Sequence, residues 1–373
     1  MKKAAYPPDS TGKNQKTVIM VIAAIFAVIC AATVFFSRLP ISGNDGGPVT
    51  VTDGSGRSVV IKSSNRVAST SARVAQIICG TGAFFKLAGV TVDDGNYDIH
   101  GYNIGIRNDG YPALIREGLI SGALVDIGGM YRISAESILL ANPDLVIMGS
   151  SFNSDATISQ LEGLGIPVVI FKEENTIADI HFNIELIGKA LGKVAEAEAL
   201  INDINSSIEK VVDWTRSLNA GSPGLAIFPG YGYETGSYAY GSGIVMGTPL
   251  IEMLGGVNVF SYISGKYEIV STEAIAAANP DIIIDTSGRN RSDLDSIKTN
   301  PITKSVTAAQ RDAIYGAFDL CNSAIPIYTQ SFVNAVALTA MFMYEDYLDF
   351  RIDRYMGDDY VDYLEKFWIQ INS

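Results

Sequence analysis

Two stretches of the chain, SAESILLANPDLVI at Ser134–Ile147 and STEAIAAANPDIII at Ser271–Ile284, are copies of one another. They lie 137 positions apart and share eight of fourteen residues. Each copy predicts a short helix that is capped by its first serine and ended by the Asn-Pro pair, because proline disfavours a helical conformation in the residue before it. An apolar strand follows, at Asp144–Met148 or Asp281–Ile284, as is typical of a strand covered on both faces. The duplication predicts two similar α/β lobes.

Strands and helices alternate around both copies. Such strand–helix–strand units favour a parallel sheet with helices on both of its faces. The tail at 332–373 begins with an apolar helix, and we expect its Met341, Phe342 and Met343 to pack in the core. The predicted elements are strands at 66–69, 168–171, 224–228 and 313–316 and helices at 72–82, 156–164 and 249–254.

The segment KVAEAEALINDINSSIEKVVDWTRSL at 193–218 predicts one long helix between the lobes. Its apolar residues recur at threes and fours, and neither glycine nor proline interrupts it. At about 1.5 Å per residue the helix is about 39 Å long. A connector of this stiffness permits small tilts between the lobes rather than wide hinge opening.

The composition excludes several classes of protein. Lys and Arg number 27 against 40 Asp and Glu, and the formal net charge of −13 has the wrong sign for binding nucleic acid or an anionic lipid surface. A chain that is 47% hydrophobic and 18% charged is not intrinsically disordered. Its three cysteines, none in a CxxC motif, do not form a disulfide scaffold, and its two histidines argue against a histidine-rich metal site.

The segment TVIMVIAAIFAVICAATVFF at 17–36 is uncharged over twenty positions. As a helix it is roughly 30 Å long, the hydrocarbon thickness of a bilayer. Four lysines precede it and one arginine follows closely. The positive-inside bias therefore makes 1–16 a cytoplasmic tail, 17–36 a transmembrane anchor and 37–48 a flexible linker to an extracytoplasmic part.

Other interpretations of 17–36 stay open. Ala31 and Ala32 could form the cleavage site of a signal peptide, although the apolar run is long for one. Ile29 before Cys30 weakens a lipoprotein interpretation, and the lack of a polar stripe weakens that of a buried core helix. The anchor, signal and lipoprotein interpretations all place the bulk of the chain outside the cytoplasm.

Further motifs occur in a fixed order along the chain. They are VTDGSGRSVVIKSSNRVAST at 51–70, Gly128-Gly129 before the first copy, LGIPVV at 164–169, GKALGKVAEAEALI at 188–201 and MLGGVNVF at 253–260. With the duplication, these motifs resemble the iron-siderophore, haem and vitamin B12 class of ABC-transporter substrate-binding proteins, from about Val49 to the end of the chain. The resemblance implies an α/β fold of two similar Rossmann-like lobes, 49–192 and 219–373, joined by the helix at 193–218, with the ligand in the cleft between them.

The resemblance also implies a role for the glutamate in each copy. In this family an exposed glutamate of the short helix docks onto arginines of the membrane permease, and the matching positions are Glu136 and Glu273. The helix dipole stabilises a first-turn carboxylate by about 0.3–1 kcal/mol, so capping alone explains either glutamate. It does not explain one at the same point of both lobes, which favours docking. The expected partners are an ABC permease with its cytoplasmic ATPase.

Ligands of open parallel sheets bind beyond the carboxyl ends of the strands. After the strand at 224–228, the loop PGYGYETGSYAYGSG interleaves four tyrosines with five glycines. Glycine allows close backbone approach and tyrosine offers a broad apolar face, so the loop suits a large planar ligand or chelate, unless the tyrosines pack on the core of their own lobe. After the next strand of this lobe, Arg289 or Arg291 could hold a carboxylate or phosphate, or be solvated.

The first lobe contributes Arg73 at a helix start and a long stretch at 93–129 that is rich in Gly, Asn and Tyr. Long irregular loops in compact domains are usually functional or mobile. His100 is a candidate axial ligand there, whereas His181 is expected to be structural. No catalytic residue, metal site or cofactor is expected. The expected ligand-binding residues are Arg73, Tyr97, Tyr102, Tyr111, Tyr131, Arg132, Tyr231, Tyr233, Tyr240, Arg289 and Arg291.

Two alternative functions stay open, a two-lobed chelatase-like enzyme and a ligand sensor without a permease. A chelatase would need a His–Glu pair facing the cleft, and only His100 could supply its histidine. The sequence has no GxSxG, P-loop or HExxH motif, which favours binding over catalysis. A receptor for bare zinc or manganese ions would need more histidines. The sequence does not separate siderophore, haem and corrinoid ligands, nor does it show whether Cys79 and Cys321 are free thiols.

Overall fold

The computed structural model describes residues 47–91, 111–129, 133–149, 154–228, 236–286, 291–317, 332–356 and 360–373, and Pro48–Ser373 form one compact unit. The predicted tail at 1–16, the predicted anchor at 17–36 and nearly all of the linker at 37–48 lie outside the described residues. Within the ranges above, no helix has both the length and the apolar character needed to cross a bilayer.

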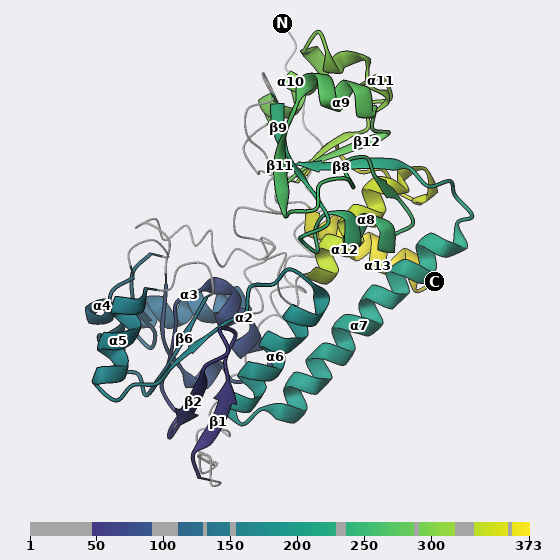
Figure 1. Cartoon of the computed structure of the whole chain (residues 1–373). Helices are drawn as coiled ribbons and strands as arrows, with labels where there is room; N and C mark the ends of the chain where they lie inside the picture. Colours follow the sequence, from purple (N-terminus) through teal and green to yellow (C-terminus); the bar gives the residue numbers. More distant parts are fainter. Residues whose placement is uncertain are drawn as a thin grey trace, which may run out of the picture. The chain divides into compact units, whose positions relative to one another are not determined.

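The first half of the chain builds a five-stranded parallel sheet (Figure 1). Its strand order is β5 (Val125–Asp126), β4 (Leu87–Val90), β3 (Val67–Ser69), β6 (Leu145–Met148) and β7 (Val168–Ile170). All residues of the last four of these strands are buried, as expected where helices cover both faces. The helices of this half are α2 (Ala72–Gly80), α3 (Tyr111–Ser121), α4 (Ala135–Leu139), α5 (Asp155–Gly163) and α6 (Ile177–Leu191), with a 3-10 turn at Phe84–Lys86.

The second half builds another five-stranded parallel sheet. Its order is β10 (Val257–Asn258), β8 (Gly224–Phe228), β12 (Ile282–Asp285), β13 (Ile314–Ala317) and β14 (Tyr355–Met356). The predicted alternation of strands with helices and the predicted parallel pairing are therefore confirmed in both halves. The helices of this half are α8 (Thr248–Met253), α9 (Thr272–Ala278), α10 (Arg291–Thr299), α11 (Thr307–Gln310), α12 (Phe332–Met343) and α13 (Tyr360–Ile371).

The helix of the internal repeat has the same caps in both copies. Ser134 caps α4 and Ser271 caps α9, and each hydroxyl accepts a hydrogen bond from the backbone N–H three residues on, at 3.1 and 3.2 Å. Beyond the helices, Asn142 (φ 46) and Asn279 (φ 44) adopt the left-handed conformation, which asparagine tolerates better than most residues. The predicted starts and ends of both helices are thus confirmed.

The aspartate that follows each Asn-Pro pair fixes the neighbouring strand. The backbone N–H of Asp144 donates to the carbonyl of Arg66 at 2.8 Å, and the Asp144 carboxylate accepts from the N–H of Arg66 at 2.9 Å, just before β3. Asp281 makes the same pair of bonds with Gly224, both at 2.8 Å, at the start of β8. The repeated sequence therefore aligns β6 with β3 in one sheet and β12 with β8 in the other.

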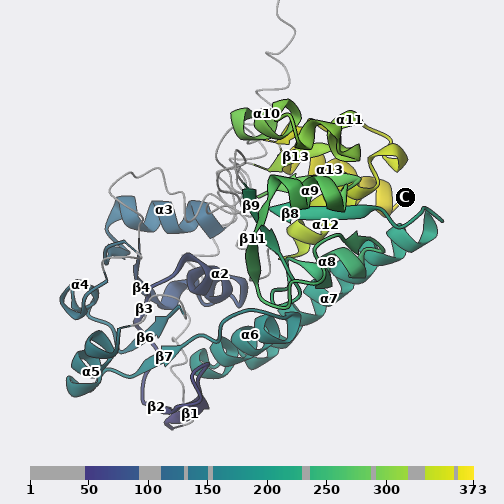
Figure 2. The same ribbon diagram turned by 45° about the horizontal axis from the view of Figure 1, so that its top comes forward.

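The long helix α7 (Val194–Ser217) confirms the prediction for 193–218. Gly192 (φ 68) separates it from α6, and Figures 1 and 2 show the two helices side by side. A β-carbon on Gly188 would lie 2.5 Å from that of Ala197, so glycine is needed for this close approach. Near its other end, the Trp214 ring meets those of Tyr344 and Phe367 edge-on, with centroids 6.1 and 5.0 Å apart. The helix α7 thus begins against α6 and ends against α12 and α13.

The helix α12 packs in the core, as the sequence predicts. Met341, Phe342 and Met343 are 0%, 1% and 6% exposed, and Phe342 stacks on Tyr315 of β13 with ring centroids 4.6 Å apart. These residues therefore stabilise the second sheet.

Two antiparallel ribbons, β1 (Val49–Thr52) with β2 (Ser58–Ile61) and β9 (Gly236–Tyr240) with β11 (Tyr267–Ser271), are not among the predicted elements. Within 51–70 only the strand at 66–69 is predicted, and 229–243 is expected to be one loop. Both ribbons are short, and their stability depends on the sheets against which they pack.

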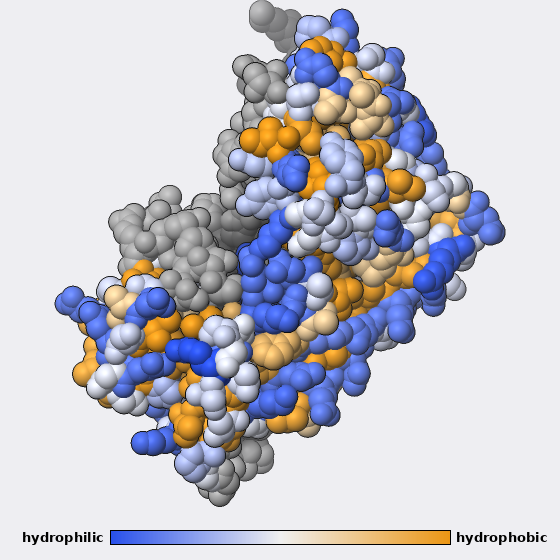
Figure 3. Space-filling model, viewed as in Figure 1, coloured by the Kyte–Doolittle hydropathy of each residue, from blue (hydrophilic) through white to orange (hydrophobic). Residues whose placement is uncertain are grey.

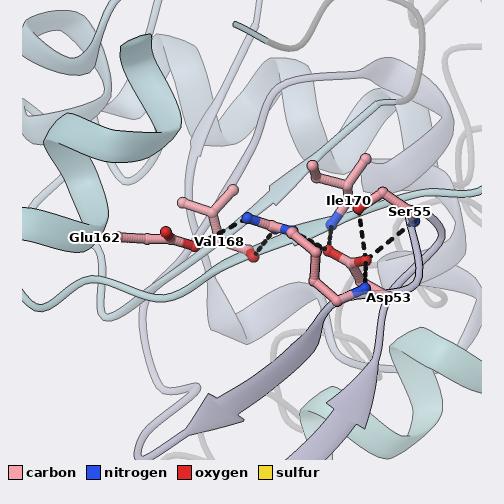
Figure 4. Close-up of polar contacts among 6 residues, drawn as sticks. Asp53, Ser55, Glu162, Val168 and Ile170 are labelled. Carbon is pink, nitrogen blue, oxygen red and sulfur yellow. Dashed lines mark hydrogen bonds and ion pairs between the residues drawn. The ribbon is translucent and has the colours of Figure 1, made fainter. Parts of the chain in front are cut away.

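The turn between β1 and β2 is tied to β7 by Asp53 (Figure 4). Its side chain is buried and accepts three hydrogen bonds from the turn, one from the N–H of Ile170 and two from the guanidinium of Arg57. Arg57 also donates to the carbonyl of Val168 at 2.7 Å and to the carboxylate of Glu162 at 3.1 Å. These bonds satisfy the outward-facing polar groups of β7, the last strand of its sheet, and so protect that edge.

Candidate functional site

Arg73 lies at the carboxyl edge of the first sheet, where ligands of parallel α/β sheets bind. Ser71 occupies the N-cap position of α2, two residues after the end of β3, which places Arg73 in the first turn of the helix. The neighbouring strand β6 ends at the same edge, and Gly149 N donates to the hydroxyl of Thr70 at 3.3 Å. A β-carbon on Gly149 would lie 3.1 Å from that of Ser71, so a glycine here lets the two strand ends approach closely.

A buried carboxyl group lies beside Arg73. Glu174 follows β7, is 4% exposed, and has its Oε2 3.8 Å from Nη1 of Arg73. Its Oε1 accepts a hydrogen bond from Nδ2 of Asn183 on α6 at 3.0 Å. Burial raises the pKa of Glu174 to about 8, although Arg73 and Asn183 both act to lower it. At neutral pH the carboxyl group is therefore largely protonated and adds little negative charge to offset Arg73.

Asn183 holds this arrangement in place. It is fully buried on α6, and its amide forms a closed pair of hydrogen bonds with the backbone of Lys172, at 2.9 Å from the N–H and 2.8 Å to the carbonyl. The segment that carries Glu174 is thus fixed to α6 at two residues, Lys172 and Glu174.

Charged residues surround this buried group. The ammonium of Lys172 lies 2.6 Å from the Asp179 carboxylate, and although burial opposes it, hydrogen bonds from Lys172 and Thr176 hold the pKa of Asp179 below its usual value. Glu173 forms an ion pair with Lys266, which lies just before β11 in the second half. The segment after β7 thus contains one buried carboxyl group, that of Glu174, and two neighbouring ion pairs, Lys172–Asp179 and Glu173–Lys266.

Two tyrosines of the second half, Tyr238 and Tyr267, lie on the ribbon of β9 and β11. Tyr238 and Tyr267 meet edge-to-face with ring centroids 5.4 Å apart, and Tyr267 is 52% exposed. The predicted ligand residue Tyr240 is 5% exposed and packs in the main core cluster, so little of its ring is accessible to a ligand in this structure. Because alternate residues of a strand face opposite sides, Tyr238 and Tyr240 point the same way but differ in depth.

Most of the remaining predictions for the ligand site lie outside the described residues. They are Tyr97, Tyr102, Tyr131, Arg132, Tyr231, Tyr233 and Arg289, together with His100. Tyr111 begins α3 and Arg291 begins α10, but the positions of their side chains are outside the description. Among the predicted ligand residues, the structure therefore describes the side chains of Arg73 and Tyr240.

The two predicted docking glutamates occupy equivalent positions. Glu136 and Glu273 both lie in the first turn of a short helix and are exposed. The backbone N–H of Glu273 itself and the hydroxyl of Ser271 lower the pKa of Glu273, which keeps it ionised at neutral pH. Both helices lead back to the amino end of a parallel strand, β6 or β12, so their first turns lie toward the carboxyl edges of the two sheets.

Of the three cysteines of the chain, the structure describes Cys79, and it also describes His181. Burial raises the pKa of the Cys79 thiol to about 12, and Cys79 is a free cysteine, whereas Cys321 lies outside the described residues. His181 lies on α6 with its Nε2 buried.

Glu174 and Asn183 are the residues that the sequence analysis missed. The run Lys172-Glu173-Glu174-Asn175 directly after the strand at 168–171 is a signal that could have located Glu174, because it puts charge at the carboxyl end of a buried strand. The partner Asn183 could not be identified this way, since it reaches the site only through the packing of α6.

The comparisons of this chain with known proteins all point to one family. The sequence profile described as periplasmic binding protein matches residues 67–318. The "Uncharacterized ABC transporter substrate-binding lipoprotein YvrC" of Bacillus subtilis (strain 168) is 24% identical over 244 residues, which cover 65% of this chain and 70% of that protein. The "Fe(3+)-citrate-binding protein YfmC" of the same organism is 24% identical over 224 residues, which cover 57% of this chain and 66% of the relative.

Among solved structures, the periplasmic heme-binding protein RhuT from Roseiflexus sp. RS-1 in its apo form superposes with a TM-score of 0.58 at 21% identity. The match covers 76% of this chain and 98% of RhuT, which shows a shared fold. The family profile spans well over half of the chain and includes strands of both parallel sheets. The chain therefore belongs to the periplasmic binding protein family.

Proposed function

We propose that this chain is the substrate-binding protein of an ABC importer, which captures a metal chelate and delivers it to a membrane permease. The observation that carries the proposal is the pair of capped helices, α4 and α9, that present Glu136 and Glu273 at equivalent points of two parallel sheets. The names of the relatives support the ligand class, since YfmC is a ferric-citrate-binding protein and RhuT a heme-binding protein. In this function the protein binds and releases its ligand and performs no catalysis.

In the proposed architecture, 49–192 and 219–373 act as two lobes joined by the helix at 193–218, and the ligand lies between them. The segment 17–36 tethers the protein to the membrane, with 1–16 in the cytoplasm and 37–48 as the linker, so that the globular part is extracytoplasmic. The name of YvrC as a lipoprotein supports attachment to the membrane surface. A ferric siderophore, haem or a cobalamin is the proposed ligand.

Arg73 is the proposed anchor for an acidic group of the ligand. Its side chain is 39% exposed at the carboxyl edge of the sheet, where it can reach a ligand, while the buried Glu174 lies behind it. Ferric citrate, most ferric siderophores and haem carry carboxylates or other anionic groups that a guanidinium can bind. Glu174 and Asn183 act as positioning residues, because they hold the segment against which Arg73 packs.

Two experiments test the proposal. In a thermal-shift panel of ferric citrate, ferric siderophores, haemin and cobalamins, we expect at least one chelate to raise the melting temperature of the purified protein. Stabilisation by free Zn²⁺ or a sugar alone would contradict the ligand class. In an uptake assay, the double variant Glu136→Arg/Glu273→Arg is expected to abolish transport while ligand affinity stays normal.

A matched control for the uptake assay is Glu198→Arg/Glu209→Arg, which reverses two exposed charges on α7. Transport should survive this change because α7 carries neither of the proposed docking groups. If the docking variant loses ligand binding, or if both double variants lose transport equally, Glu136 and Glu273 have no specific role in docking.

A further inference from the structure

An apolar groove lies beside Glu136, between α4 and α5, and the fold itself does not require it. The groove has a volume of about 590 Å³ and is lined by Ala135, Glu136, Leu139, Leu140, Gln160 and Leu164. Leu139, Leu140 and Leu164 are 37%, 69% and 63% exposed. Figure 3 shows apolar surface at the end of the molecule where α4 and α5 lie. Exposed apolar residues that gather on one surface mark an interaction site more often than single ones do.

The second copy of the repeat shows that these leucines are not needed to form the helix. In α9 the positions of Leu139 and Leu140 are occupied by Ala276 and Ala277. The serine cap, the left-handed asparagine and the buried isoleucine are nevertheless the same in both copies. In α4 the core contact is made by Ile138, which is fully buried, while the two leucines that follow it face outward. The two leucines therefore form an exposed apolar surface on α4 and are not needed for the helix to fold.

The charge beside the groove indicates what occupies it. Glu136 is exposed, and within the described ranges it forms no ion pair. A partner that brings a cation to this carboxylate also brings its neighbouring side chains over Leu139 and Leu140. The groove accordingly fits a basic residue flanked by an apolar side chain, and not a purely charged loop.

We propose that the groove takes up an apolar side chain adjacent to the permease residue that pairs with Glu136, so that α4 is the stronger of the two docking helices. This inference rests on the proposed delivery to a permease and adds an asymmetry to it. The helix α9 offers its glutamate with alanines at the two equivalent positions. The first half of the chain therefore holds the permease through apolar and charged contacts, and α9 through its charge.

The test gives α4 the two alanines that α9 has at the equivalent positions. The variant Leu139→Ala/Leu140→Ala is compared with the wild-type full chain for binding to the cognate ABC permease in lipid nanodiscs. We expect the affinity for the permease to fall by about tenfold or more, because truncated apolar groups at the centre of an interface commonly have effects of this size. The matched control is Ile369→Ala on α13, which removes an apolar side chain that is 73% exposed, and it should leave the affinity unchanged.

Salt separates the apolar contact from the charged one. Between about 0.05 M and about 0.5 M NaCl, the effect of Glu136→Gln should shrink, because salt screens exposed charges. The effect of Leu139→Ala/Leu140→Ala should persist. Ligand affinity should not change in either variant. The melting temperature should fall only slightly, because both sites lie on the surface and Glu136→Gln removes only the interaction of one exposed carboxylate with the helix dipole.

The outcomes distinguish the inference from the function on which it rests. If the wild-type chain does not bind the permease at all, the proposed function fails. If the wild-type chain and the double-alanine variant bind equally well, the groove has no role while the proposed function stands. If the wild-type chain forms dimers in sedimentation and the variant does not, the groove binds a second copy of the chain and the inference is overturned.

Discussion

Nη1 of Arg73 lies 3.8 Å from Oε2 of Glu174, so that an exposed guanidinium and a buried carboxyl group from distant parts of the sequence meet at one sheet edge. Asn183 donates a hydrogen bond of 3.0 Å to the other oxygen, Oε1, of this carboxyl group. Because Glu174 is largely protonated at neutral pH, it supports Arg73 without cancelling the charge that an anionic ligand would use.

Because the pKa of the buried Glu174 is raised, we expect its contribution to the free energy of unfolding to decrease as the pH rises. Below about pH 4.5 both the folded and the unfolded chain carry the Glu174 proton, and between about 4.5 and about 8 only the folded chain keeps it. Across this window Glu174 lowers the free energy of unfolding by on the order of 1 kcal/mol per pH unit, and above it the loss is complete. Urea unfolding at several pH values should show that Glu174→Gln removes this slope. Glu209→Gln, at an exposed position of α7, should leave it in place.

For Asp53 we expect the opposite dependence, in which its contribution to the free energy of unfolding decreases as the pH falls. Burial opposes its ionisation, but hydrogen bonds from Arg57 and Ser55 hold its pKa below the usual value. The stability that it supplies is thus present above the pKa of the unfolded chain and is lost as the pH falls through the folded pKa. Asp53→Asn should lower the free energy of unfolding by roughly 1–3 kcal/mol at neutral pH, and by less in acid. The exposed Asp213→Asn serves as the control, and equal losses in both variants would contradict the role of Asp53 shown in Figure 4.

Arg73→Gln tests the proposed ligand anchor. Removal of one charge-assisted hydrogen bond, worth roughly 1.5–3 kcal/mol, should weaken the binding of haemin or ferric citrate by about ten- to hundredfold. Ligand titration by fluorescence quenching measures this change, and the melting temperature without ligand should stay close to that of the wild type. Arg216→Gln on α7, whose side chain is 73% exposed, removes the same charge away from the sheet edge. An equal loss of affinity in this variant would show a general effect of charge.

The thiol of Cys79 should be inert in the folded protein. Its pKa of about 12 leaves almost no thiolate at pH 8, and the residue is buried. Peptide mapping after treatment with iodoacetamide should find Cys79 unmodified in the native protein and fully modified in denaturant. Rapid alkylation of the native protein would show that α2 opens readily.

The sequence by itself determined the repeated unit and the long helix. The duplicated Ser-x-Glu and Asn-Pro-Asp positions act through local chemistry: a hydroxyl that caps its own helix, an asparagine that tolerates the left-handed conformation, and an aspartate that aligns the next strand. The apolar spacing of α7 and the absence of glycine and proline within it likewise act within one segment. Such signals can be read without knowing which other segments lie nearby.

The tertiary structure alone decided the surroundings of each functional side chain. The high pKa of Glu174 arises from burial in the folded chain, against the opposing effects of Arg73 and Asn183, and the sequence around Glu174 shows only a run of charges. Tyr238 and Tyr240 stand two positions apart in a tyrosine-rich segment, yet Tyr240 is almost fully buried while Tyr238 meets an exposed tyrosine of β11. Burial and proximity depend on which elements pack together, and that packing is a property of the whole chain and not of any one segment.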